Sequence, residues 1–174
     1  MDVRYPIGKF EKPKQIGKQE LSGWIRIIAG FPEEIAREVL SLTDEQLETP
    51  YREGGWMVRQ VVHHCADSHM NAFIRFKLAL TETSPLIKPY HEALWAALPD
   101  SKIHLEPSLN LLRGLHERWS KLLESLGDED LKRTYVHPEQ GRPIPLDEAI
   151  GMYAWHCNHH LGHITVLKKS RNWV

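Results

Sequence analysis

The amino-acid sequence predicts an all-α protein, a four-helix bundle whose helices run up-down-up-down. Three observations predict this class. Apolar residues recur at helical spacing in four long stretches, strand signals are few, and no repeat of about 20 to 50 residues occurs. The chain has 174 residues, of which 41% are hydrophobic, so residues 1–174 are expected to form one domain around one core.

The N-terminal third of the chain is predicted to hold an arm and the first helix. Residues 1–17 are expected to be an extended arm, because two prolines and several charged side chains disfavour a helix. The first helix is predicted over residues 20–42, with a kink or a fresh start at Pro32. Thr43 precedes three polar residues as an N-cap does, and a glycine-containing loop follows.

Three further helices follow from the apolar spacing. They are predicted over residues 56–81, 107–126 and 146–169, and the last has basic residues in its final turn, where they suit the helix dipole. Residues 90–98 are expected to form two or three turns. The sequence TYVHPEQGRPIP is expected to be a proline-rich connection.

Charge and cysteine usage exclude several classes of protein. Lys plus Arg is 22 and Asp plus Glu is 23, so the net charge of −1 leaves no basic surface for nucleic acid or an anionic membrane. No apolar run is long enough for a membrane span or a signal peptide, so a cytoplasmic location is expected. The two cysteines, Cys65 and Cys157, are not expected to form a disulfide.

Histidines cluster in two short windows, one in the second predicted helix and one in the last. Seven of the 11 histidines are involved: His63, His64, His69, His156, His159, His160 and His163. The apolar stripe of the last helix is Leu146, Ile150, Tyr153, Cys157, His160, Ile164 and Leu167, so His160 stands where a leucine is expected. A buried imidazole without partners costs roughly 1 to 3 kcal/mol, which indicates that something binds this ring.

The spacing of three of these histidines predicts a metal site. His156 lies four residues before His160 and on the same helix face, and His64 is expected to approach from another helix. Three imidazoles suit one divalent ion per chain, Zn²⁺ first and Ni²⁺ as an alternative, with a fourth position left for water. Asp67 and Tyr153 are candidates to hold a ligand or a water.

The other clustered histidines have less specific interpretations. His63, His69 and His159 are expected to be exposed or hydrogen-bonded between helices, because neighbours of a ligand point about 100° away. His163 could orient a water, bind substrate or pack in the core. Catalysis by either cysteine is disfavoured, and Arg59, Arg142 and Arg171 are candidates to receive an anionic substrate.

Two segments resemble signatures of the DinB/YfiT-like family. In WMVRQVVHHCAD, the positions of Trp56, His64 and Asp67 match the tryptophan, metal histidine and acid of the first signature. The segment HCNHHLGHI resembles the second signature through the pair 156 and 160 and the glycine at 162, but His163 replaces the usual glutamine. The resemblance extends over nearly the whole chain.

The resemblance implies a DinB-like bundle, a three-ligand metal site, a homodimer and a small-molecule substrate. It also implies, in several branches of the family, transfer chemistry with a low-molecular-weight thiol. The first hypothesis is therefore a hydrolase with a metal-activated water, and the second is a bacillithiol S-transferase with a metal-bound thiolate. A third is a non-catalytic metal-binding stress module, which predicts a closed site without a pocket.

Overall fold

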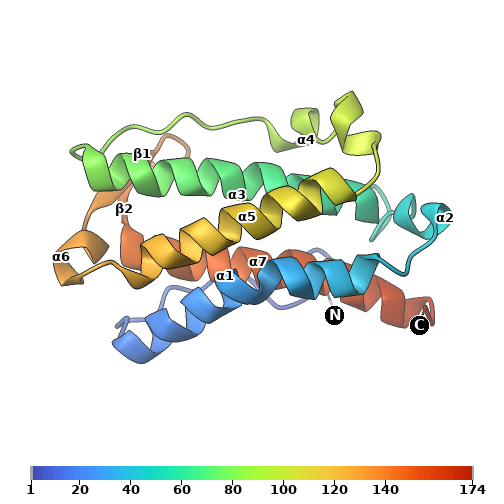
Figure 1. The fold of residues 1–174 in the computed structure, drawn as a ribbon, viewed down its shortest axis with the longest axis horizontal. Coiled ribbons are helices and arrows are strands. Elements are labelled where there is room, and N and C mark those ends of the chain that lie inside the picture. Colours follow the sequence, from blue (N-terminus) through green and yellow to red (C-terminus); the bar gives the residue numbers. More distant parts are fainter. Residues whose placement is uncertain (1, 174) are drawn as a thin grey trace.

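The computed structural model describes residues 2–173, and four long helices pack side by side in it (Figure 1). These helices are α1 (Lys18–Val39), α3 (Val58–Thr81), α5 (Glu106–Glu124) and α7 (Leu146–Ser170). The shorter elements are α2 (Asp44–Leu47), α4 (Glu92–Trp95), the 3₁₀ helix η1 (Pro99–Lys102), α6 (Asp128–Leu131), β1 (Thr134–His137) and β2 (Arg142–Pro145). The predicted four-helix bundle is confirmed.

The directions of the helices differ from the prediction, because α3 and α5 run parallel. His63, near the start of α3, contacts Ser108, near the start of α5. Further along both helices, Phe76 packs edge-on against Trp119. The connection between them, residues 82–105, returns the chain to the end of the bundle where α3 began (Figure 1).

Helices α1 and α7 are the second parallel pair. Trp24 packs against Gly151 in their first halves, and Lys168 bonds to Glu38 near their C-terminal ends. In Figure 1 the pair α1 and α7 runs opposite to the pair α3 and α5, so the order is up-down-down-up, and the predicted up-down-up-down order is wrong. Residues 82–105 can run the length of the bundle because an extended chain advances about 3.3 Å per residue, whereas a helix advances about 1.5 Å per residue. The spacing of apolar residues gives no information about this path.

The proline-rich connection is a β-hairpin rather than an irregular loop. Strands β1 and β2 pair antiparallel, with Tyr135 opposite Ile144 and both side chains buried. Gly141 has a φ of 62° in the turn, where a glycine is free of the strain that a side chain would add. The hairpin closes the end of the bundle between α6 and α7 (Figure 1).

Two smaller expectations change. Helix α1 continues through the buried Pro32, so no fresh start occurs there. Within residues 90–98 the only regular element is α4, a single turn, and η1 follows it. The other long helices begin and end within a few residues of the predicted bounds.

Residues 2–17 contain no helix or strand and lie partly against α7. The indole of Trp155 donates to the carbonyl oxygen of Gly8 at 3.1 Å. At Gly162 an added Cβ would lie only 3.0 Å from Pro6, so the absence of a side chain lets the arm approach the helix. The arm therefore covers the part of α7 that is rich in histidines.

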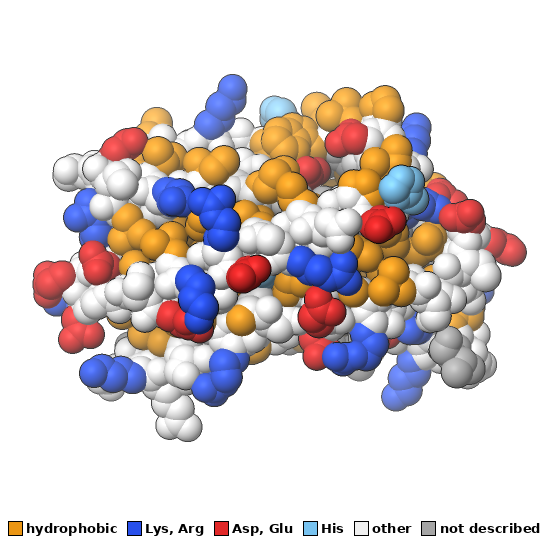
Figure 2. Space-filling model, viewed as in Figure 1, with side chains coloured by type: hydrophobic (Ala, Val, Ile, Leu, Met, Phe, Trp, Pro, Cys, Tyr) orange, Lys and Arg blue, Asp and Glu red, His pale blue; other side chains and the backbone are white. Residues whose placement is uncertain are grey.

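The surface agrees with the balanced composition. Basic and acidic side chains are interspersed over the visible face, with apolar side chains between them (Figure 2). No helix within the described residues is long and apolar enough to cross a membrane.

Candidate metal centre

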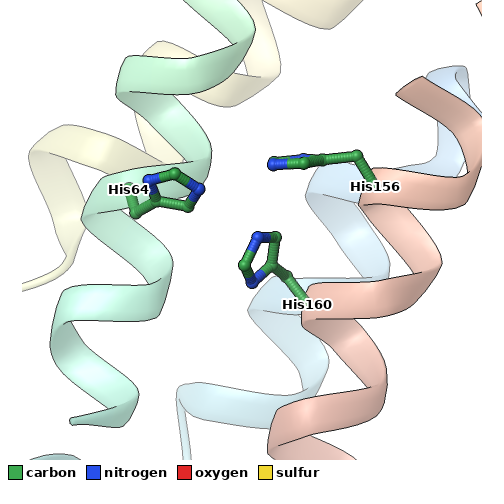
Figure 3. Close-up of side chains that lie close together, drawn as sticks. All are labelled: His64, His156 and His160. Carbon is green, nitrogen blue, oxygen red and sulfur yellow. The ribbon is translucent and has the colours of Figure 1, made fainter. Parts of the chain in front are cut away.

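The structure brings together the three histidines proposed as metal ligands. Helix α3 provides His64, and α7 provides His156 and His160 from successive turns (Figure 3). One ring nitrogen of each lies within 4.8 Å of the others. The i, i+4 spacing places the two rings of α7 on one face, with their centroids 4.4 Å apart, and His64 faces them across the gap between the helices.

Burial keeps these rings uncharged. His64 and His160 are 4% and 6% exposed, and burial lowers the pKa of His64 to about 4 and the pKa of His160 well below its usual value. The pKa of His156 is also well below its usual value, again mainly through burial. Neutral imidazoles have free lone pairs for a cation, so this donor set fits Zn²⁺ or Ni²⁺.

A second group of histidines shares one member with the first. Ligand atoms of His159, His160 and His163 also lie within 4.8 Å of one another, and the Nδ1 atom of each is buried without a hydrogen-bond partner among the described residues. A neutral imidazole has one lone pair, so His160 can serve only one ion at a time. The first group joins two helices and borders a pocket, which makes it the better metal centre.

The expectation for His159 is wrong. Its ring is only 8% exposed, stacks on Trp155 with centroids 4.4 Å apart, and makes no interhelical hydrogen bond in the part of the chain that the structure describes. Helical spacing placed it away from the core, but the N-terminal arm covers it, and Tyr5 lies 5.9 Å from its centroid. Burial by a distant segment leaves no signal in helix periodicity.

A pocket opens beside the metal centre. Its volume is about 200 Å³, and His156 and Ser68 form part of its wall. The remaining lining is mixed, with Phe10, Pro89, Met152 and Trp155 as apolar side chains and Arg75, Tyr90, Glu92, His137, Glu139 and Tyr153 as polar ones. A small molecule that entered this pocket would lie next to His156, one of the three candidate ligands.

The additional site candidates fall in different places. Tyr153 lines the pocket, and its hydroxyl accepts a hydrogen bond from Arg75 at 3.0 Å. Asp67 is half-buried, its side chain makes no hydrogen bond within residues 2–173, and burial raises its pKa to about 6. His163 stacks on Tyr51 with centroids 3.9 Å apart. Of the three candidates, only Tyr153 borders the pocket.

The three arginines proposed for an anionic substrate do not line this pocket. Arg59 pairs with Asp44 and Glu48, and Arg142 pairs with Glu148. Arg171 is exposed beyond the end of α7. The arginine of the pocket is Arg75, which sequence spacing did not single out.

Both cysteines are unsuited to catalysis. Cys65 and Cys157 are free thiols with 0% exposure, and burial raises the pKa of each. A neutral buried thiol is a poor nucleophile.

Two further histidines are candidates for a functional role: His116, which the sequence analysis did not single out, and His69, for which it expected no role at the metal centre. His69 is hydrogen-bonded between helices, one of the two outcomes expected of it, and one of these bonds, at 3.0 Å, is to the candidate ligand His156. His116 bonds to the other side of His69 at 2.8 Å. Periodicity could have found His116, since the buried stripe of α5 is Leu109, Leu112, His116, Trp119 and Leu123.

Comparison with known proteins decides the family. A family model described as the DinB superfamily matches residues 32–164. The chain belongs to this superfamily. Relatives from Bacillus cereus and Bacillus thuringiensis subsp. konkukian, each 54% identical over 172 residues and covering 99% of both chains, carry the name "putative metal-dependent hydrolase".

Two solved structures are similar to this DinB protein. YfiT from Bacillus subtilis, described as a probable metal-dependent hydrolase with an unusual four-helix bundle topology, has a TM-score of 0.97 at 47% identity over the full length of both chains. A mycothiol-dependent maleylpyruvate isomerase has a TM-score of 0.61 at 16% identity, covering 80% of this chain and 60% of that one. The second likeness shows a shared fold.

Proposed function

We propose that this protein is a metal-dependent hydrolase of small molecules, with one divalent cation held by His64, His156 and His160. The observation that carries the proposal is the convergence of three uncharged imidazoles from two helices at the wall of a pocket. The names of the relatives from the two Bacillus species support the same activity. When bound, the ion supplies Lewis acidity and lowers the pKa of a water that occupies its open position.

The residues of the pocket have separate tasks in this proposal. Phe10, Met152 and Trp155 provide an apolar wall that excludes water around the substrate. Arg75 presents a positive charge to the bound molecule, and its hydrogen bond to Tyr153 holds its side chain in place. The volume of about 200 Å³ restricts the part of the substrate that enters to a small group.

The two competing functions differ in what they require of the site. A non-catalytic metal-binding module needs no pocket, so the pocket beside His156 favours an enzyme. Transfer of a low-molecular-weight thiol such as bacillithiol uses the same three ligands. It needs a thiol from solution, because both cysteines of the protein are buried. We place hydrolysis first because it needs no second substrate in a small pocket.

The finer properties of the enzyme are part of the same proposal. Zn²⁺ is the proposed ion, with Ni²⁺ as the alternative, since both accept imidazole ligands. A homodimer is proposed from the family resemblance, and size-exclusion chromatography with light scattering measures it. Elemental analysis of protein purified without any chelator should find one divalent ion per chain.

The activity is tested with p-nitrophenyl esters and with p-nitroanilide amides. The zinc-loaded protein should release chromophore faster than protein treated with chelator, and His64→Ala should be inactive. His104→Ala is a matched control, because His104 is exposed and lies outside the metal centre. Turnover that appears only after bacillithiol is added would replace hydrolysis with thiol transfer, and metal content well below one ion per chain would contradict the metal centre.

A further inference from the structure

A chain of hydrogen bonds leads from one metal ligand through the core of the bundle. Nδ1 of His156 on α7 lies 3.0 Å from Nε2 of His69 on α3. Nδ1 of His69 lies 2.8 Å from Nε2 of His116 on α5. Nδ1 of His116 lies 2.5 Å from the backbone carbonyl oxygen of Ile28 on α1. This series of hydrogen bonds therefore involves all four long helices and ends on a backbone carbonyl group.

The carbonyl group at the end sets the direction of every hydrogen bond. The oxygen of Ile28 can only accept, so Nδ1 of His116 donates the proton. Nε2 of the neutral His116 then accepts from Nδ1 of His69, and Nε2 of His69 accepts from Nδ1 of His156. One tautomer is left for each ring, and in His156 the lone pair lies on Nε2.

We infer that His69 and His116 are positioning residues that hold His156 in the tautomer whose Nε2 is free to bind the metal ion. The inference rests on the proposed function only for the identity of the metal centre. The tautomer itself is a property of the metal-free polypeptide and does not depend on the activity. In the metal-free protein the Ser68 hydroxyl, 3.4 Å from Nε2 of His156, can donate to the lone pair there, which agrees with this tautomer, and a bound ion would take the place of that hydrogen bond.

The hydrogen bonding of the ring nitrogens distinguishes a positioning role from simple packing. His69 and His116 are 0% and 1% exposed, and all four of their ring nitrogens have a partner. His160, by contrast, has a buried Nδ1 without a partner among the described residues. Within residues 2–173, the hydrogen-bond chain thus fixes the ring of His156 before an ion binds, whereas Nδ1 of His160 has no such partner.

The first experiment reads the tautomers directly in metal-free protein. Long-range ¹H–¹⁵N correlation spectra of ¹⁵N-histidine-labelled protein at neutral pH should show His156, His69 and His116 with the proton on Nδ1. In His69→Leu, the His156 signals should move towards the Nε2-protonated form that free histidine prefers. A wild-type His156 protonated on Nε2 would overturn the inference whether or not the protein is a hydrolase.

The second experiment measures Zn²⁺ affinity by competition with a chromophoric chelator. His69→Leu should weaken Zn²⁺ binding roughly 10- to 100-fold, as loss of a group that orients a ligand does. His69→Gln should restore most of the affinity, because its amide oxygen can accept from His156 while its amide nitrogen donates to His116. His116→Leu should show a weaker loss than His69→Leu, since it acts one ring further from the ligand.

His63→Leu is the matched control. His63 is also a buried histidine of α3 with hydrogen bonds to other segments, but its ring bonds to Ser108 and to the Ile103 carbonyl rather than to a ligand. It should lower the melting temperature and leave Zn²⁺ affinity unchanged. Wild-type affinity in folded His69→Leu, or equal losses in His69→Gln and His69→Leu, would overturn the positioning role.

Discussion

Helix α7 contributes to two buried polar clusters, and their side chains differ in the partners that surround them. Near its first turn, the 2% exposed Glu148 receives hydrogen bonds from Lys12 and Arg142, two cations from other segments. Two turns further on, the rings of His156 and His160 face a third imidazole, and no acidic group is part of this cluster within the described chain. The chain therefore provides cations that pair with the carboxylate, whereas the neutral histidine rings have no charged partner in their group.

The pKa shifts follow from this difference. Burial would raise the pKa of Glu148, but the hydrogen bonds from Arg142 and Lys12 lower it, so the carboxylate stays charged. Burial, with smaller contributions from His159 and His163, lowers the pKa of His64 to about 4, so this ring stays neutral. One cluster is complete as folded, and the other is suited to an added cation.

The largest expected effect is the loss of metal binding when a ligand is removed. His64→Ala, His156→Ala and His160→Ala should each weaken Zn²⁺ binding by more than about 100-fold, because loss of a supporting residue alone costs 10- to 100-fold. His159→Ala should retain tight binding, since its ring faces the arm. Chelator competition measures both. Tight binding kept in His64→Ala and His156→Ala but lost in His159→Ala would assign the ion to the group of His159, His160 and His163.

The buried histidines should make the metal-free protein sensitive to acid. The pKa of His116 is lowered to about 4 by burial, so the unfolded state takes up a proton first as the pH falls below about 6.5. Stability is then lost between these pH values, on the order of 3 kcal/mol at pH 4 for this group. Urea unfolding as a function of pH measures the slope.

The matched variant for this pH dependence is His116→Gln. Glutamine can keep both hydrogen bonds of His116 but takes up no proton in this range. Its stability should therefore fall less steeply with acid than that of wild type. Identical slopes would show that His116 does not contribute to the acid sensitivity.

Added metal should stabilise the histidine cluster and leave the carboxylate cluster unaffected. Free Zn²⁺ at about 100 times Kd contributes roughly 2.7 kcal/mol, or roughly 5 to 10 °C in melting temperature for a chain of this size. The chelated protein should remain folded at room temperature, because the four helices already share an apolar core. Melting curves with chelator, Zn²⁺ and Ni²⁺ test this, and coincident curves at confirmed occupancy would contradict a clamp between α3 and α7.

The smallest expected effect comes from breaking the carboxylate cluster. Arg142→Met removes one donor from the buried Glu148 and should cost about 1 to 3 kcal/mol, with Zn²⁺ affinity unchanged. Arg37→Met is the control, because its pair with Glu34 is exposed on both sides and contributes at most about 1 kcal/mol. Equal costs in urea unfolding would mean that burial of Glu148 does not strengthen its ion pairs.

Local patterns in the sequence were sufficient for the helices and for part of the site. The three- and four-residue spacing of apolar side chains predicts α1, α3, α5 and α7, because a helix repeats its buried face on that period. The same spacing places His156 and His160 on one face, and the conflict between imidazole and an apolar stripe indicates a bound partner. These features depend only on residues a few positions apart.

Tertiary structure alone decided how the helices are ordered and what surrounds the candidate ligands. The parallel pairing of α3 with α5 depends on the path of residues 82–105, and the burial of His159 depends on an arm about 150 positions away in the sequence. The contact of His69 with His156 likewise joins segments that periodicity treats separately. Helical spacing fixes which face a side chain is on, but the side chain's partners depend on which helices pack against that face.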